Sequence, residues 1–254
     1  MIYNNSLELP NRLQKPRSLG INMLIDKGLD FSTFSSYVID HNSAIDYVKF
    51  TSGIILVDSQ IKRKIELCKV NNIIPYAGGT LFEKFFFQSQ IDAYTQLMHE
   101  LEFDTVEISN GVLDADFEKI SEYIKFFKDR GFKVLVEIGS KDTDFVMPPS
   151  IWIKQINAAI DHGADKLILE GRESGTAGLY RESGEIRTGL LQEIKNQISL
   201  EKLIFEAPNK KSQCYLINKF GCNVNLGNIN FNDLNILEVQ RLGLRYDTFF
   251  IKNE

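Results

Sequence analysis

The sequence predicts an α/β protein with a single (β/α)8 barrel, the TIM-barrel fold. Short runs rich in β-branched residues alternate with longer amphipathic segments along almost the whole chain. Eight such runs can be marked, which is the number that closes a parallel barrel, and 254 residues is a usual length for one. An open, doubly wound sheet is the alternative that the same alternation allows.

The predicted strands are short and apolar, as expected of strands buried on both faces. Three of them share one design, a lysine, three apolar residues and a glutamate: Lys133–Glu137, Lys166–Glu170 and Lys202–Glu206. In chain order, the eight are Ile21–Ile25, Asp46–Phe50, Ile73–Tyr76, Thr105–Ile108, Lys133–Ile138, Lys166–Glu170, Lys202–Glu206 and Asn223–Leu226.

Helices are predicted between these strands, where apolar residues recur at helical spacing. Thr80 and Glu83 have the spacing of a capping box, and glycines follow several helices where their ends are expected. The predicted helices are Thr33–Asn42, Ser59–Asn71, Glu83–Leu101, Asp116–Arg130, Ser150–His162, Ile186–Ile198, Lys210–Phe220 and Asn232–Leu242, with helix-ending glycines at Gly131, Gly163, Gly221 and Gly243.

The chain is predicted to form one domain, residues 19–254, preceded by a polar N-terminal arm, residues 1–18. Composition does not change along the barrel segment, and no linker interrupts it. The arm carries Pro10 and Pro16 and lacks the apolar centre of a secretory signal.

Charge and cysteine content exclude several classes of partner. Lys and Arg number 29 against 34 Asp and Glu, which gives a net charge of -5, so neither nucleic acid nor an anionic membrane surface is expected. No apolar run approaches the roughly 20 residues that span a bilayer. The three cysteines form no metal-type pair, which favours a reducing, cytoplasmic location.

In a (β/α)8 barrel the chemistry lies on the loops that follow the strands, so the functional residues are expected in these segments. Almost every one contributes a charge, an amide or a glycine turn. The segments are Asp26-Lys27-Gly28, Lys49, Gly78-Gly79-Thr80, Glu107 with Ser109-Asn110-Gly111, Glu137 with Gly139-Ser140-Lys141-Asp142, Glu170 with Arg172-Glu173-Ser174-Gly175, Glu206 with Pro208, and Asn225 with Gly227-Asn228.

Four glutamates at one rim need compensating cations. Two like charges about 6 Å apart repel by roughly 3 kcal/mol at an effective dielectric of 20. Lysines and an arginine can offset them, and a magnesium ion is the other solution, since it prefers carboxylate oxygens. Glu107, Glu137 and Glu170 are expected to face the mouth, although any one glutamate could instead face outward and pair with a helix lysine; Glu206 and Glu173 receive no task. The histidines fall away from the mouth, so histidine-based chemistry is not expected.

Two glycine-bearing turns are candidates for binding an anion. Gly78-Gly79 leads into a helix whose free N–H groups would favour phosphate or carboxylate. Asn225, Gly227 and Asn228 accompany the last strand, near which barrels often bind phosphate. Each turn could equally be ordinary turn chemistry.

With these loops in view, the chain resembles the phosphosulfolactate synthases, barrel enzymes that add sulfite to phosphoenolpyruvate with magnesium. The matching residues run nearly from end to end. They are Lys15-Pro16-Arg17, Asp26-Lys27-Gly28, Lys49, Gly78–Glu83, Glu107-Ile108-Ser109, Gly139 with Lys141-Asp142, Glu170 with Arg172–Gly175, Glu206-Ala207-Pro208, Asn223–Ile229, and Gly243-Leu244-Arg245 with Asp247-Thr248.

The chain departs from the family pattern in three places. Phe50-Thr51-Ser52-Gly53 stands where the family usually has glycine, tryptophan and glycine followed by threonine and serine. Ser140 replaces the first lysine of a double-lysine turn, and Gly171 replaces the alanine before Arg172.

The resemblance implies a reaction in which sulfite attacks phosphoenolpyruvate, an enediolate forms with Mg²⁺ on its carboxylate, and a lysine protonates it to give (2R)-2-O-phospho-3-sulfolactate. On that basis Lys141 is expected to deliver the proton, and Lys27 and Lys49 to attract the anionic reactants. The expected ligands of the Mg²⁺ are Glu107, Glu137 and Glu170. Arg172, Asn225, Gly227, Asn228, Gly78 and Gly79 are expected to bind phosphate or carboxylate.

Two other readings stay open, a catalytically silent relative that only binds a ligand or a protein, and a barrel lyase or aldolase that uses another nucleophile or a lysine imine. The aromatic run Phe85–Phe87 packs either within the subunit or between subunits, and we expect a homo-oligomer, with a trimer as one option.

Overall fold

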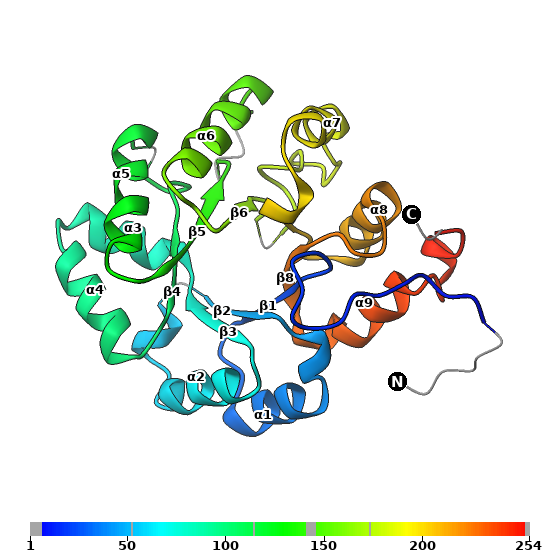
Figure 1. The fold of residues 1–254 in the computed structure, drawn as a ribbon, viewed down its shortest axis with the longest axis horizontal. Coiled ribbons are helices and arrows are strands. Elements are labelled where there is room, and N and C mark those ends of the chain that lie inside the picture. Colours follow the sequence, from blue (N-terminus) through cyan, green and yellow to red (C-terminus); the bar gives the residue numbers. More distant parts are fainter. Residues whose placement is uncertain (1–6, 52, 114, 141–145, 173, 252–254) are drawn as a thin grey trace.

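The chain forms a closed barrel of eight parallel strands, in sequence order from β1 to β8, with helices around it (Figure 1). This computed structural model describes residues 7–251 except 52, 114, 141–145 and 173. The strands are β1 Asn22–Asp26, β2 Tyr47–Phe50, β3 Ile74–Ala77, β4 Thr105–Ile108, β5 Lys133–Ile138, β6 Lys166–Leu169, β7 Leu203–Glu206 and β8 Leu226–Asn230. The predicted (β/α)8 barrel is therefore confirmed.

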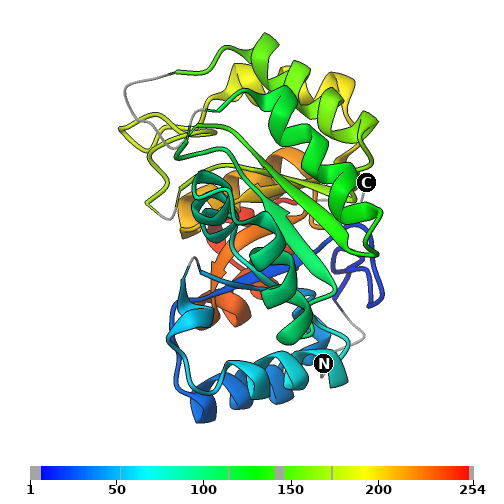
Figure 2. The ribbon, with the colours of Figure 1, turned by 90° about the vertical axis from the view of Figure 1, so that its left-hand side faces the viewer.

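The helices cover the outside of the barrel, with α1 and α2 on one side of it and α5 to α7 on the opposite side (Figure 2). They are α1 Phe31–Asp40, α2 Ile61–Val70, α3 Gly79–Phe87, α4 Ile91–Glu100, α5 Phe117–Lys128, α6 Pro149–Asp161, α7 Thr188–Gln197, α8 Lys210–Phe220 and α9 Leu234–Arg241. None of the helices in the described ranges is long and apolar enough to cross a membrane.

Helix α5 illustrates how the sequence places these helices. Ile120, Ile124 and Phe127 recur at helical spacing and are buried against the sheet. Asp116 caps the N-terminus by accepting the backbone N–H of Glu118, and basic residues occupy the last turn.

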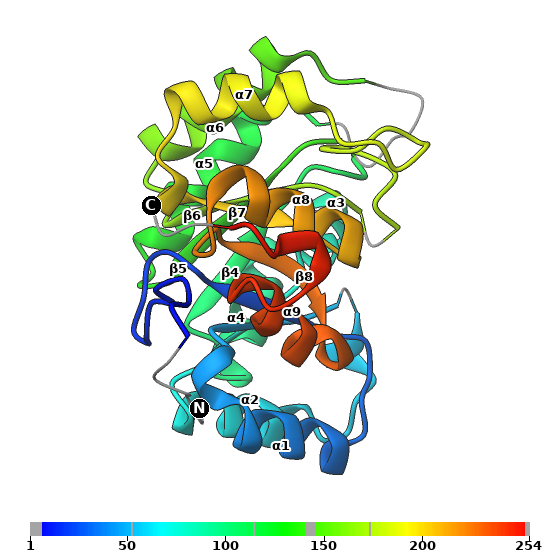
Figure 3. The same cartoon turned by 90° about the vertical axis from the view of Figure 1, so that its right-hand side faces the viewer.

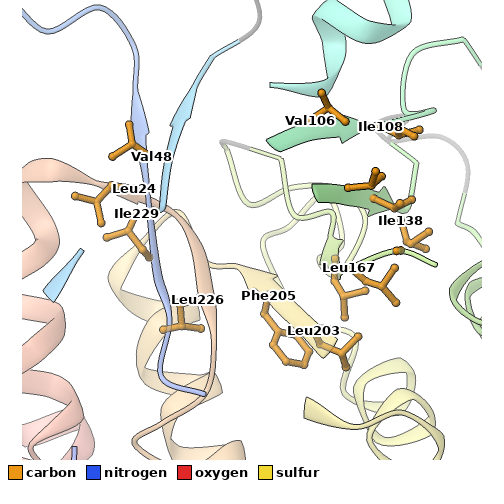
Figure 4. Packing of buried hydrophobic residues seen from close by; sticks show 14 of the residues in the cluster. Leu24, Val48, Val106, Ile108, Ile138, Leu167, Leu203, Phe205, Leu226 and Ile229 are labelled. Carbon is orange, nitrogen blue, oxygen red and sulfur yellow. The ribbon is translucent and has the colours of Figure 1, made fainter. Parts of the chain in front are cut away.

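The strands alternate between two packing environments, because successive side chains point to opposite faces. Outward residues, such as Val48, Ile138 and Leu167, join the large core between barrel and helices (Figure 4). The inward residues form a second, smaller cluster of Ile21, Met23, Tyr76, Leu135, Ile168 and Ile204, with Tyr47 packed against it.

This alternation explains why charged side chains gather inside the barrel. Glu137 follows the inward Leu135 by two positions, Glu170 follows Ile168, and Glu206 follows Ile204. Each glutamate therefore points inward, one layer closer to the C-terminal ends of the strands. A hydrophobic layer supports a charged one.

The N-terminal arm lies at the opposite end of the barrel from the long loop between β6 and α7 (Figure 3). Arg12 pairs with Glu238 of α9 at 2.9 Å, and Arg17 pairs with Asp46 at 2.8 Å. Lys15 donates to the backbone oxygen of Ile45 at 2.6 Å. These bonds tie the arm to the N-terminal ends of the strands.

Two predicted elements differ from the structure. The predicted helix Glu83–Leu101 is two helices, α3 and α4, because the chain turns at Ser89, whose φ is +56°. The last strand lies several residues later than predicted, at Leu226–Asn230 instead of Asn223–Leu226.

The aromatic run at the end of α3 is divided between core and surface. Phe85 and Phe86 pack against the core, whereas Phe87 is 69% exposed. The expected homo-oligomer stays a prediction.

Candidate active site

A cavity of about 280 Å³ opens at the C-terminal ends of the strands, where the sequence predicted the mouth. Most of its lining is polar or charged. It is lined by Ile25, Lys49, Thr51, Gly78, Gly79, Thr80, Glu137, Glu170, Arg172, Glu206 and Asn228.

Lys49 occupies the centre of the buried charges. Its Nζ lies 3.1 Å from Glu107 Oε1, 3.2 Å from Glu137 Oε2 and 3.5 Å from Glu206 Oε1. Burial disfavours the ammonium form, but the three carboxylates outweigh it and raise the pKa of Lys49 well above its ordinary value. Lys49 is therefore a fixed cation that binds these carboxylates together.

Glu206 and Glu170 also bind the turn that follows β6. The N–H of Gly171 donates to Glu206 Oε2 at 2.8 Å, and the N–H of Arg172 donates to Glu170 Oε1. Arg172 has a φ of +57°, a conformation that non-glycine residues rarely adopt. The turn is thus held by two carboxylates of the cavity.

Arg172 differs from Lys49 in having no acidic partner in the part of the chain that the structure describes. Its side chain is exposed at the cavity, and among the described residues its guanidinium forms no hydrogen bond or ion pair. An arginine in this state can bind a carboxylate or phosphate through two parallel hydrogen bonds.

The N-terminus of α3 forms the opposite wall. Gly79 donates its N–H to Glu107 Oε1 at 2.6 Å, and a Cβ at this position would lie 2.6 Å from Ser109 Oγ. Glycine is therefore required for the close contact between α3 and β4. Glu107 lies behind this wall, fully buried, and does not line the cavity.

Glu83 does not form the capping box predicted with Thr80, because the N-cap of α3 is Gly78. Its carboxylate accepts instead the backbone N–H groups of Val112 and Leu113, at 2.8 and 3.0 Å. Glu83 thereby fixes the loop after β4 beside the cavity.

Asn228 is placed as predicted, at the cavity. It lies in β8 where the pairing with β1 shifts register, and its φ is +55°. The side chain is buried, and its Oδ1 has no hydrogen-bond partner among the described residues. A buried acceptor without a partner is available to a bound ligand.

The other two predicted residues of this segment lie elsewhere. Asn225 precedes β8, and its side chain binds backbone groups at the closed end of the barrel, among them Ile21 N at 2.9 Å and Leu203 O at 2.9 Å. Gly227 lies inside the barrel, where a Cβ would be 3.0 Å from Met23 Cε. Their predicted substrate role does not fit these positions, and the later start of β8 is the reason.

Of the two remaining predicted lysines, only Lys27 belongs to the part of the chain that the structure describes, and it does not line the cavity. Lys27 is exposed in the loop after β1. Lys141 lies outside the described residues, so its predicted role is neither supported nor opposed by this geometry.

A second buried charge cluster, which the sequence did not reveal, supports the loops after β1 and β2. Lys64 of α2 binds Asp26 at 2.7 Å and Asp58 at 2.8 Å, and Asp26 also accepts the N–H groups of Gly28 and Leu29. No spacing rule links Lys64 to Asp26 across 38 positions, so only the folded chain shows this contact.

Comparison with known proteins agrees with the geometry. The family model described as (2R)-phospho-3-sulfolactate synthase (ComA) matches residues 10–247. A phosphosulfolactate synthase of Bacillus subtilis is 41% identical over 249 residues, covering 97% of this chain and 98% of that protein. One from Methanocaldococcus jannaschii is 41% identical over 236 residues, covering 91% and 94%.

Similarity to solved structures supports the fold. The YdjI aldolase of Escherichia coli K12 superposes with a TM-score of 0.59 at 12% identity, over 88% of this chain and 80% of that one. At this identity it speaks for the barrel and not for the reaction. The near-complete match to the family model and to the curated relatives shows that this chain belongs to the phosphosulfolactate synthase family and is an enzyme of that family.

Proposed function

We propose that this enzyme adds sulfite to phosphoenolpyruvate and forms (2R)-2-O-phospho-3-sulfolactate. The observation that carries the proposal is Arg172, a cation without an acidic partner among the described residues, at a carboxylate-lined cavity of a chain in this family. Phosphoenolpyruvate carries a carboxylate and a phosphate, either of which suits a guanidinium.

In this reaction the sulfur lone pair of sulfite forms a bond to the terminal methylene carbon of phosphoenolpyruvate. The electrons of the carbon–carbon double bond move toward the carboxylate, and the phosphate-bearing carbon then accepts a proton. The enzyme must therefore bind two anions side by side, stabilise charge on the carboxylate and supply one proton.

Magnesium is part of this proposal because the described side chains leave the cavity acidic. Three buried glutamates line it beside two cations, Lys49 and Arg172, and both reactants are anions. Among the described residues, no three His, Cys, Asp or Glu side chains are grouped to hold a metal ion by themselves. Mg²⁺ commonly takes only one or two carboxylates and completes its shell with substrate oxygens and water.

Glu137 and Glu170 are the residues that fit such a site, since both line the cavity. Glu107, the third predicted ligand, lies behind the wall and binds Gly79 and Lys49 instead. Bound Mg²⁺ would supply positive charge beside the substrate carboxylate.

The lysine-imine reading is disfavoured by the state of Lys49. An imine requires a neutral amine, whereas the pKa of Lys49 is raised by Glu107, Glu137 and Glu206 against the effect of burial. For the same reason Lys49 is a poor proton donor, and Lys141 is left as the proposed source of the proton.

The metal requirement is tested by chelation. Sulfite-dependent consumption of phosphoenolpyruvate, followed through its vinyl protons by NMR, should stop when divalent ions are removed and resume when magnesium is added back. A chelated enzyme of unchanged activity would contradict the metal part of the proposal. Incubation with phosphoenolpyruvate and borohydride should leave the protein mass unchanged, because no imine forms.

A further inference from the structure

Glu206 has no assigned task in the proposed reaction, yet it is 1% exposed and makes two different contacts. One oxygen, Oε1, lies 3.5 Å from Lys49 Nζ, and the other, Oε2, accepts the Gly171 N–H at 2.8 Å. Both oxygens of this carboxylate are thus bound by protein groups, one by a side chain and the other by the backbone.

The turn that Glu206 binds contains a residue in an unfavourable backbone conformation. Arg172 at φ +57° is in the left-handed region, which is disfavoured for a residue with a side chain. Consecutive N–H groups, those of Gly171 and Arg172, point at Glu206 and Glu170, so the two carboxylates stabilise this backbone conformation.

The same turn, at the start of the β6–α7 loop, is packed tightly against Tyr180 from the middle of that loop. A Cβ on Gly171 would lie 2.6 Å from Tyr180 Cε2, and the Tyr180 hydroxyl donates to the backbone oxygen of Glu206 at 2.6 Å. Glu206 of β7 therefore contributes to the position of the Gly171–Arg172 turn in two ways. Its side chain binds the Gly171 N–H directly, and its carbonyl binds Tyr180, which packs against Gly171.

We propose that Glu206 is a positioning residue for anion binding: it holds the Gly171–Arg172 turn in the conformation that presents the Arg172 guanidinium to the cavity. Because it also binds Lys49, it couples the fixed cation at the centre of the barrel to the available cation at its rim. The proposal rests on the proposed function, since it takes the bound anion to be phosphoenolpyruvate.

A double-mutant cycle tests whether Glu206 acts through Arg172. Glu206→Gln should raise the KM for phosphoenolpyruvate by about tenfold, the loss expected for one hydrogen bond to a charged group, with a smaller change in kcat. In an Arg172→Ala background the same substitution should change KM by less than about twofold, since there is no guanidinium left to position. Equal effects of Glu206→Gln in both backgrounds would overturn the proposal.

Glu107→Gln is the matched control. Glu107 also binds Lys49 and one backbone N–H, that of Gly79, but on the other side of the cavity from Arg172. Its effect on KM should be the same in both backgrounds. If Glu107→Gln were as dependent on Arg172 as Glu206→Gln is, the coupling would run through Lys49, and the proposal would fail.

Folding and activity controls keep these outcomes separate. Circular dichroism and thermal melting check each variant, and Glu206→Asp replaces Glu206→Gln if the latter does not fold. The shorter carboxylate keeps its charge near Lys49 but cannot reach both partners, so the same cycle applies. A wild-type enzyme that does not consume phosphoenolpyruvate with sulfite would refute the proposed function itself, whereas an active wild type with independent effects refutes only the role of Glu206.

Discussion

Lys49 is the common partner of three buried carboxylates at the C-terminal ends of the strands. Lys49 binds Glu107, Glu137 and Glu206, so three glutamates from three strands share one ammonium group. The desolvation of such a cluster is costly, and breaking it by removing one member leaves uncompensated buried charge. The same carboxylates keep Lys49 protonated. Lys49 therefore serves as a fixed positive charge, and in our proposal a different residue, Lys141, donates the proton.

Lys141→Ala tests that separation. The substitution should abolish product formation while phosphoenolpyruvate still binds, because the cavity residues Lys49 and Arg172 are unchanged. Turnover measured with sulfite, together with calorimetric binding of phosphoenolpyruvate, checks both parts. Near-normal turnover would show that Lys141 is not the proton donor and that another group supplies the proton.

The turn after β6 shows how a short segment brings a charge to the cavity. Gly171 has room for a hydrogen only, since Tyr180 lies where a side chain would be. The position of Tyr180 therefore requires glycine at residue 171 in this chain.

Gly171→Ala should therefore destabilise the protein by about 1–3 kcal/mol, the usual range for overpacking, and lower its activity. Gly189→Ala is a matched control in helix α7, where an added Cβ meets nothing within 4 Å. The control should be neutral or stabilising by up to about 1 kcal/mol, because alanine favours helix. Urea denaturation of both variants measures the difference, and equal stability of the two would contradict the packing argument.

How far the sequence predicts each element depends on the clarity of its pattern. The Lys-apolar-Glu strands were located to within a residue, because an apolar run ending in a charge marks both the strand and the mouth. The sequence places β8 too early because polar and apolar residues already alternate over Asn223–Leu226, and the alternation changes phase at Gly227-Asn228, where the pairing with β1 shifts register. Asn225 therefore lies before the strand, at the closed end of the barrel, and not at the mouth.

At the scale of the whole molecule, the two ends of the barrel have different roles. The end with the cavity carries the candidate active site, and the opposite end, here called the structural end, anchors the N-terminal arm. The cavity lies at the C-terminal ends of the strands, while Arg12, Lys15 and Arg17 tie the N-terminal arm to the opposite end. Sequence reasoning predicted the first of these, because strand order fixes which loops meet. It could not predict the second, because the contact of Arg12 with Glu238 joins residues 226 positions apart.

An ion pair at this structural end makes the free energy of unfolding depend on pH in the acid range. Burial opposes ionisation of Glu238, but Arg12, Arg241 and Asn22 outweigh it and lower its pKa from 4.5 to about 2. Its stabilising effect is therefore complete above about pH 4.5 and is lost as pH falls toward about 2, a contribution of about 3 kcal/mol. Denaturation curves across this range should be less pH-dependent in Glu238→Gln by about that amount, and identical slopes would exclude this ion pair as the cause.

The central claim, that this barrel joins sulfite to phosphoenolpyruvate, is tested most directly by phosphorus NMR. Phosphoenolpyruvate is incubated with the enzyme and magnesium, with and without sulfite. The account predicts a new phosphate-ester signal that appears only when sulfite is present and grows as the phosphoenolpyruvate signal falls. An unchanged spectrum in the presence of sulfite, or the same new signal without it, would contradict the account.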